Sequence, residues 1–173
     1  LYKRFYKERD DMFVSLCFDK HTLLGQAFFL RKKIPGKGIC TWVTQLVVHN
    51  KYRNRKIGSK LLHSAWGFSD YYAWGLATAN AITLKTLESA TWREINIEDI
   101  SRNIKVLEQL VEDIPFAEKE NIRLSPQTSQ IFTNFYPEFE PSNNESGLGV
   151  YAKKLGDIQS GNEWLAFTFA SQE

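Results

Sequence analysis

The segment 40–68 constrains the fold more than any other part of this chain. A β-forming run at 40–48 (CTWVTQLVV) is followed by a segment, 56–68, whose apolar residues recur at three- and four-residue steps, as in an amphipathic helix. The turn between the two carries five cations, with a glycine at the expected helix start: Lys51, Arg53, Arg55, Lys56, Lys60 and Gly58. Such a turn presents backbone N–H groups and the positive end of a helix dipole to an anion. The segment therefore predicts a phosphate-binding turn.

The remaining elements place this turn within a mixed fold. Strands are expected at 12–19, 23–32, 40–48, 73–79, 129–135 and 163–169, the first two forming an antiparallel hairpin. Helices are expected at 56–68, at 81–91 after Asn80 as N-cap, and over 96–114, where Asn96 is a second candidate cap. The segment 136–149 has the composition of a loop. This order predicts an α/β chain with a central sheet.

Composition limits the classes of protein to which the chain can belong. A chain of 173 residues, 43% hydrophobic and 14% aromatic, suits one packed domain. No window approaches the roughly 18 apolar residues of a membrane-spanning helix, and two cysteines, Cys17 and Cys40, do not make a disulfide scaffold. No signal peptide is visible, so we expect a cytoplasmic protein without membrane association. Because the chain begins at Leu1, we expect it to be a piece of a longer protein or a processed chain.

The charges are distributed unevenly along the chain. Between Lys20 and Ser69 there are ten Lys and Arg residues and no Asp or Glu, whereas the rest of the chain has twelve basic and twenty acidic residues. A single basic run is commonly a solvated face. Fifty consecutive residues without a carboxylate favour an anionic ligand for this half.

The basic turn resembles one known phosphate loop and differs from two others. It lacks the G-x-x-x-x-G-K-[ST] of nucleotide-hydrolysing P-loops and the three glycines of a dinucleotide fingerprint. Residues 53–58 (RNRKIG) resemble the pyrophosphate loop of the GNAT superfamily of N-acetyltransferases, [QR]-x-x-G-x-[GA], and residues 76–93 (LATANAITLKTLESATWR) resemble the family's next strand and helix. The resemblance covers about 12–95 well and the last two strands loosely.

The resemblance implies a fold and a donor substrate. The fold would be α/β (α+β): a GNAT-like central mixed, mostly antiparallel sheet flanked by helices, with an extra helix near 97–113. The chain 1–173 would be a single acetyltransferase domain that lacks the family's N-terminal elements. The acyl donor would be acetyl-CoA, held by residues that the family's motifs place at Leu46, Val47, Val48, Arg53, Asn54, Arg55, Lys56, Ile57, Gly58, Ser59 and Asn80. In that arrangement the Leu46 N–H polarises the thioester carbonyl as an oxyanion donor.

The sequence departs from the family pattern where the family often has catalytic groups. Leu87 stands where the family often has a tyrosine acid, and Trp42 stands where some members have a glutamate base. Lys56 replaces the first glycine of the loop, at a cost of about 1 kcal/mol or more if the turn needs a positive φ there. Direct attack of an amine on a thioester needs no enzyme nucleophile, so acid and base can vary. The candidates for the base are His49 and Glu138, with Glu140 as an alternative to the latter.

Three functions follow from these observations. The first is an N-acyltransferase that moves an acetyl group from acetyl-CoA to a primary amine of a small molecule, protein or peptide. The second is a non-catalytic GNAT-like domain of a larger protein that binds CoA or serves as an interaction domain. The third is a nucleic-acid-binding module that uses the basic half, although its aromatic residues lie within expected strands. The three histidines lack H-x-x-x-H spacing, so no metal site is expected.

Overall fold

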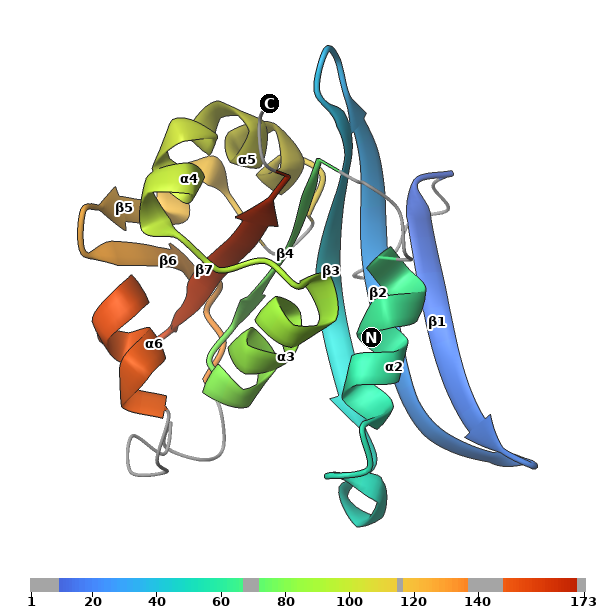
Figure 1. Cartoon of the computed structure of the whole chain (residues 1–173). Helices are drawn as coiled ribbons and strands as arrows, with labels where there is room; N and C mark the ends of the chain where they lie inside the picture. The colour runs from blue at the N-terminus through green and yellow to red at the C-terminus, as the bar shows by residue number, and fades with distance from the viewer. Residues whose placement is uncertain (1–9, 67–71, 115–116, 137–147, 171–173) are drawn as a thin grey trace.

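The structure is a computed structural model that describes residues 10–66, 72–114, 117–136 and 148–170. The elements follow one another along the chain as β1 (Met12–Asp19), β2 (Thr22–Ile34), β3 (Gly38–Val48), η1 (Asn50–Tyr52), α2 (Ile57–Trp66), β4 (Ala73–Thr78), α3 (Ala81–Thr91), α4 (Ile97–Arg102), α5 (Ile104–Val111), η2 (Lys119–Asn121), β5 (Ile122–Ser125), β6 (Thr128–Phe132), α6 (Leu148–Leu155) and β7 (Asn162–Phe169). Figure 1 shows the strands as one twisted sheet with the helices packed around it.

The sheet of the described residues has seven strands in the order β1-β2-β3-β4-β7-β6-β5. Neighbouring strands are antiparallel except β3 and β4, which are parallel. A parallel pair needs a crossover connection, and α2 with its preceding loop supplies one because it lies between β3 and β4 in the chain. The prediction of a central mixed, mostly antiparallel sheet flanked by helices is confirmed.

The predicted strands are all present, with ends displaced by at most a few residues. Besides the short 3-10 turns η1 and η2, one strand and one α-helix were missed. The four residues of β5 offer too few alternations to identify a strand by pattern. The helix α6 begins at Leu148, within the segment expected to be a loop, because GLGV does not resemble a helix start.

The two helices beside the parallel strands agree with the sequence pattern. α2 buries the predicted apolar face together with Trp66, and the predicted Phe68 lies outside the described residues. α3 starts after Asn80, whose side chain accepts a hydrogen bond of 2.9 Å from the Ile82 N–H. Asn96 likewise caps α4 through the Glu98 N–H at 2.8 Å.

The predicted single helix near 97–113 is wrong, because the chain forms two helices, α4 and α5, that meet at Asn103. The buried Asn103 amide donates from Nδ2 to the Asp99 carbonyl at 2.8 Å, and its Oδ1 accepts from the Lys37 ammonium at 3.0 Å and from the Tyr72 hydroxyl. A side chain that bonds its own helix backbone competes with regular helical hydrogen bonding. The apolar periodicity continues through this break, so the sequence pattern did not indicate that the helix ends at Asn103.

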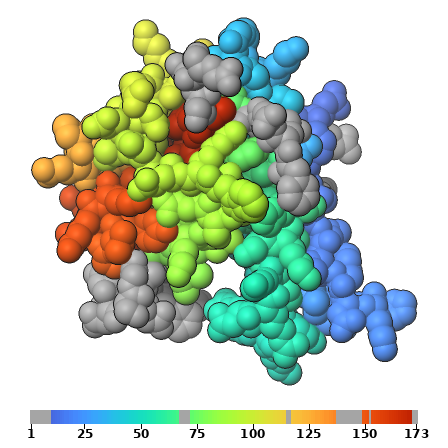
Figure 2. Space-filling model, in the orientation of Figure 1, coloured from blue at the N-terminus to red at the C-terminus, as the bar shows by residue number. Residues whose placement is uncertain are grey.

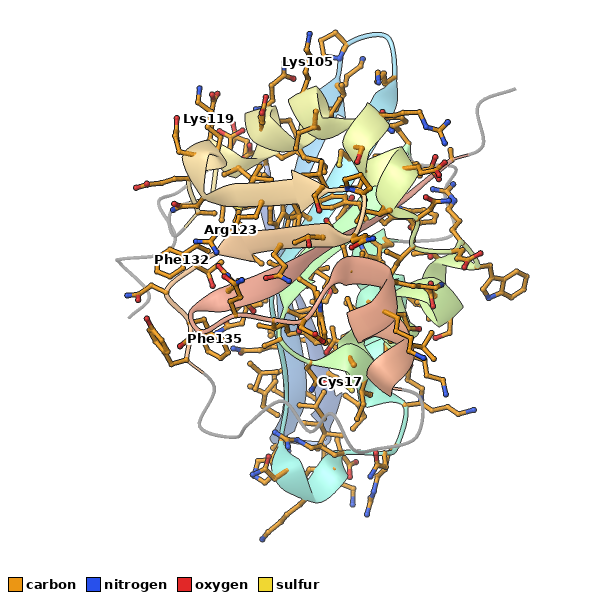
Figure 3. The ribbon with its side chains drawn as sticks, turned by 90° about the vertical axis from the view of Figure 1, so that its left-hand side faces the viewer. Cys17, Lys105, Lys119, Arg123, Phe132 and Phe135 are labelled. Atoms are coloured by element: carbon orange, nitrogen blue, oxygen red, sulfur yellow. The ribbon has the colours of Figure 1, made fainter. Side chains whose placement is uncertain are left out.

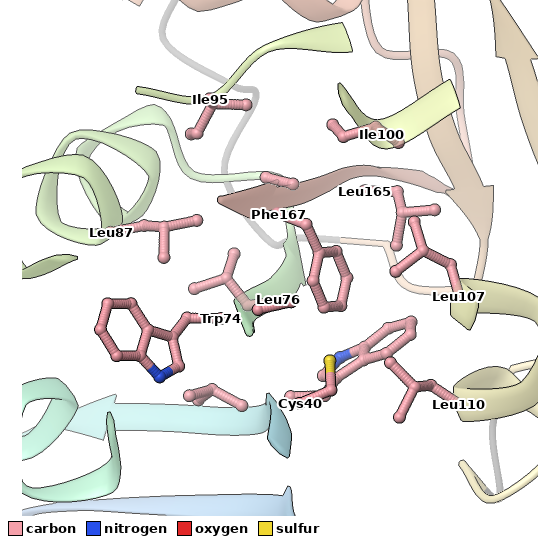
Figure 4. Close-up of a cluster of buried hydrophobic side chains, with 14 of the residues drawn as sticks. Cys40, Trp74, Leu76, Leu87, Ile95, Ile100, Leu107, Leu110, Leu165 and Phe167 are labelled. Carbon is pink, nitrogen blue, oxygen red and sulfur yellow. The ribbon is translucent and has the colours of Figure 1, made fainter. Parts of the chain in front are cut away.

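The core lies on both faces of β4 and β7. Trp74, Leu76 and Leu87 lie on one side of β4, toward α3, and Leu107 and Leu110 lie on the other (Figure 4). The ring of Phe167 on β7 meets the indole of Trp42 on β3 edge to face, with centroids 5.2 Å apart. The two rings come from the strands on either side of β4, and they meet over Gly75, which pairs with both residues.

Candidate functional site

The two parallel strands separate at the end where the basic turn begins. Their paired register runs from Cys40 with Ala73 to Val43 with Leu76 and stops there. β3 nevertheless continues to Val48, so among the described residues nothing pairs with its last segment on this side. Thr44 is the extra residue of a β-bulge against β2, and its hydroxyl donates to the Phe28 carbonyl at 3.2 Å. A bulge bends its strand and increases its twist, which accounts for the separation.

The backbone beyond the bulge directs its free groups into this opening. The His49 N–H donates to the Leu24 carbonyl of β2 at 2.9 Å. Groups alternate along an antiparallel ladder, so Val47 also faces β2, whereas the N–H and C=O of Leu46 and Val48 face away from it. Of these, the Val48 carbonyl accepts a hydrogen bond of 3.5 Å from Arg53 Nε. The two residues expected to hold the donor arm and the thioester carbonyl therefore present their backbone to the opening.

The first turn of α2 lies directly beside this open segment. A Cβ added to Gly58 would lie 3.9 Å from Leu46 Cδ2 and 3.9 Å from Val48 Cγ2. The first helical hydrogen bond runs from the Lys60 N–H to the Lys56 carbonyl at 3.0 Å, so the three N–H groups of residues 57–59 have no acceptor within the helix. Anions bind at such a helix end through these N–H groups and the helix dipole.

A small apolar cluster holds the helix end against the strands. Ile57 and Leu61 of α2 pack on the buried Ala27 of β2, and the side chains of Leu46 and Val48 complete the cluster. Because these contacts hold the first turn of α2 against β2 and β3, the packing of this cluster fixes the position of the free N–H groups.

The loop before α2 forms a positively charged rim around the helix end. Its cations Lys51, Arg53, Arg55 and Lys56, together with Lys60 of α2, are all exposed. Figure 2 shows a hollow between this loop, drawn in teal with α2, and the light-green α3. The rim and the hollow lie at the same end of the molecule as the separated strands, as expected for an anion site.

The turn does need a positive φ at the position where Lys56 replaces glycine. The φ of Lys56 is 60°, and Asn54 has a φ of 62°. Asparagine tolerates this region better than other non-glycine residues, but lysine is strained there. The backbone at Lys56 is therefore strained, as the sequence predicts for a turn that needs a positive φ there.

Replacing Lys56 with glycine is expected to stabilise the protein by up to about 1 kcal/mol, because it relieves this strain. Urea unfolding measures the change. The matched control is Lys51→Gly, where φ is not positive, and where glycine only adds freedom to the unfolded chain and lowers stability. Equal destabilisation by both changes would contradict the strain at Lys56.

The other predicted site residues have different surroundings. His49 caps η1, because its Nδ1 accepts a hydrogen bond from the Lys51 N–H at 3.2 Å. Asn80 caps α3, as described above. Leu87 and Trp42 are wholly buried in the core, so neither position faces the opening. Glu138, like Glu140, lies outside the described residues.

One carboxylate near this end was missed by the sequence reasoning. Glu163 is the second residue of β7, and it accepts hydrogen bonds from the Thr133 hydroxyl at 2.8 Å and from the Ala79 N–H. Burial raises its pKa, and these two hydrogen bonds lower it to a smaller degree. A signal was present in the sequence, since Glu163 is the one charge in a mostly apolar strand, NEWLAFTF.

Two features are absent from the described residues. No helix in the described part of the chain is long and apolar enough to cross a membrane. The same residues contain no cluster of three or more His, Cys, Asp and Glu side chains that could hold a metal ion.

Comparisons with known proteins found similarity among solved structures only. No family model and no curated protein matches the sequence. One similar structure is Arabidopsis thaliana Naa50 in complex with the bisubstrate analogue CoA-Ac-MVNAL, with a TM-score of 0.43 and 13% identity over 90% of this chain and 71% of that one. Another is the NatC complex bound to Gag peptide and CoA, with a TM-score of 0.41 and 11% identity over 92% of this chain and 71% of that one.

Proposed function

We propose that this protein is a GNAT-type N-acyltransferase that moves an acetyl group from acetyl-CoA to a primary amine. The observation that carries the proposal is the separation of β3 from β4 beyond Val43, directly beside the first turn of α2. It brings free strand backbone, free helix N–H groups and a rim of cations to one opening. A phosphate-bearing thioester with a flexible amide arm has complementary groups along its whole length.

Each part of the opening has a distinct task in this proposal. The N–H groups between Arg53 and Ser59 bind the pyrophosphate, and the surrounding lysines and arginines meet the 3′-phosphate. The backbone of Val48 holds the amide arm, whereas Val47, which the resemblance also assigned to the donor, pairs its backbone with β2. The Leu46 N–H donates to the thioester carbonyl and stabilises the negative charge that forms there during attack. The chain thereby orients the donor, and the amine itself acts as the nucleophile.

Binding of the donor is expected to stabilise the protein measurably. A ligand at a hundred times its Kd adds about 2.7 kcal/mol, which corresponds to a rise in Tm of roughly 5 to 11 °C for a chain of this size. We would measure thermal unfolding with acetyl-CoA, CoA, dephospho-CoA, ATP and a short RNA at low and moderate salt. Dephospho-CoA is the matched control for the 3′-phosphate, and it should stabilise less than CoA.

The outcomes separate the candidate functions. Stabilisation by both coenzymes supports the donor site, and release of thiol from acetyl-CoA with a peptide α-amine, a lysine side chain or spermidine then supports transfer. No response to either coenzyme would overturn the proposal. A response to RNA alone, weakening with salt, would favour the nucleic-acid-binding module.

A non-catalytic coenzyme-binding domain is the second candidate. The observation that favours it is the burial of Leu87 and Trp42, which leaves the family's usual acid and base positions without a titratable group at the opening. Coenzyme binding without thiol release for any of the three amines would support this candidate.

A further inference from the structure

We propose that the Glu163 carboxylate takes the proton from the acceptor amine, an inference that rests on the proposed function. Four features of the structure carry it: the level of Glu163 along the strands, the face of the sheet to which it points, its hydrogen bonds, and its uncharged surroundings.

Glu163 is held at the level of the opening by its neighbours on both sides. Trp164 pairs with Thr78, the last residue of β4, so Glu163 lies beside Ala79, whose N–H it binds. Extending the register that pairs Cys40 with Ala73 places Ala79 level with Leu46, or one residue further along β3 once the bulge is counted. The carboxylate and the proposed oxyanion donor therefore lie at the same height along the strands, with the end of β4 between β7 and the opening.

The carboxylate points to the face of the sheet opposite α2. Side chains alternate along a strand, so Glu163 shares a face with Phe167, whereas Trp164 and Thr168 share the other. Thr168 contacts Thr91 of α3 through hydroxyl oxygens 3.4 Å apart, which identifies the second face as that of α3. The Leu46 side chain packs toward α2, which lies beside α3. The donor, bound at the start of α2, and an amine near Glu163 therefore enter from opposite faces of the sheet. The amine can then attack the thioester carbonyl of the donor directly.

The surroundings of Glu163 in the described part of the chain supply hydrogen-bond donors but no counterion. β6 contributes the Thr133 hydroxyl and β4 contributes the Ala79 N–H, and no charged side chain in the described part of the chain shifts its pKa. The β6 residue directly opposite Glu163 is Ile131, whereas Phe132, at the end of β6 with Phe135 beyond it (Figure 3), pairs with Asn162 and so points to the other face. Since burial raises its pKa, this carboxylate binds a proton more readily than an exposed one.

The reaction balances with no further reactant. The neutral amine attacks the thioester carbon, a C–N bond forms, and the carbonyl π electrons move to the oxygen, which the Leu46 N–H stabilises. Glu163 takes the N–H proton. The carbonyl then re-forms and the C–S bond breaks with its electron pair on sulfur. The thiolate takes up a proton from water to give free CoA, and Glu163 returns its proton to water.

The test compares Glu163→Gln with the exposed control Glu120→Gln, and adds Thr133→Val. Glutamine keeps an acceptor for the Ala79 N–H, so folding should be retained. With acetyl-CoA and the peptide, lysine and spermidine amines used above, Glu163→Gln is expected to lower kcat about a hundredfold or more and to leave the Kd of acetyl-CoA unchanged. The rise of rate with pH that reports Glu163 should disappear in this variant and move to higher pH in Thr133→Val, because Thr133 lowers the pKa.

A stability measurement provides a readout that needs no acceptor. A pKa raised in the folded state means that this carboxyl favours folding when protonated and that this contribution is lost as pH rises above about 4.5 through the folded value. Glu163→Gln should therefore have a higher Tm than the wild-type protein at pH 7, and the difference should shrink toward pH 4. Glu120→Gln should show no such convergence.

The outcomes distinguish this inference from the function on which it rests. Unchanged kcat and pH profile in Glu163→Gln, with the wild-type protein active, would overturn only the role of Glu163. A lower Tm of Glu163→Gln at pH 7 would mean that the carboxylate is a structural hydrogen-bond acceptor, which would also overturn it. Failure of the wild-type protein to bind either coenzyme would overturn the proposed function first.

Discussion

Replacing Gly58 with aspartate is expected to lower the affinity for acetyl-CoA at least a hundredfold while leaving the fold intact. A side chain at this position grows into the space between the first turn of α2 and the open segment at Leu46 and Val48. Its negative charge would meet the pyrophosphate at the helix N–H groups, and a hundredfold loss corresponds to about 2.7 kcal/mol. The same charge interacts favourably with the helix dipole and stabilises the folded protein by about 0.3 to 1 kcal/mol. The Tm without ligand should therefore stay equal or rise.

The matched control is Gly58→Ala, which adds the Cβ without the charge. The nearest atoms would lie at ordinary van der Waals distance, so binding should stay within a few-fold of the wild-type value. Isothermal titration calorimetry measures both variants. Wild-type affinity in Gly58→Asp would show that coenzyme phosphates do not bind at this helix end. An equal loss of affinity in Gly58→Ala would indicate that steric contact, rather than charge, causes the loss.

Replacing Gly75 with alanine is expected to destabilise the protein by about 3 kcal/mol, the upper part of the range for overpacked cores. The added Cβ would lie 2.3 Å from two carbons of the wholly buried Phe167 ring. That ring contacts Trp42, so it cannot move aside without disturbing a second aromatic residue. For a chain of this size the expected fall in Tm is roughly 6 to 12 °C, measured by thermal unfolding.

Gly149→Ala is the control for the chemistry of the substitution. Gly149 lies in α6 with no atom within 4 Å of an added Cβ, so alanine should be neutral or stabilising by about 0.5 to 1 kcal/mol. Phe167→Leu provides a second comparison, because it shortens the ring that the new methyl group would meet. If the two changes at Gly75 and Phe167 destabilise additively, the steric explanation is wrong, since residues in contact should show a coupling energy.

The sequence predicted the elements whose signals are local. The cap of α3 at Asn80, the apolar face of α2 and the alternation of the six strands each depend on residues a few positions apart. Local patterns were insufficient at Asn103, because its contacts with Tyr72 and Lys37 come from distant parts of the chain and break a helix that the periodicity makes continuous.

The candidate site divides in the same way. The cations and Gly58 at a strand-to-helix turn are visible in the chain itself, because a helix that begins after a strand necessarily has free N–H groups at its start. The assignment of a coenzyme to that turn came from a resemblance and stays a proposal.

The tertiary structure alone decided three features of the opening. The separation beyond Val43 depends on the register between β3 and β4, and the strain at Lys56 depends on how the turn joins β3 to α2. The position of Glu163 depends on β7 lying between β4 and β6, which brings Ala79 and Thr133 to one carboxylate from opposite sides. Strand register, backbone strain and desolvation are all set by neighbours remote in sequence, whereas periodicity and capping are set by neighbours along the chain. The sequence by itself therefore determined where an anion could bind, and the folded sheet determined which groups face it.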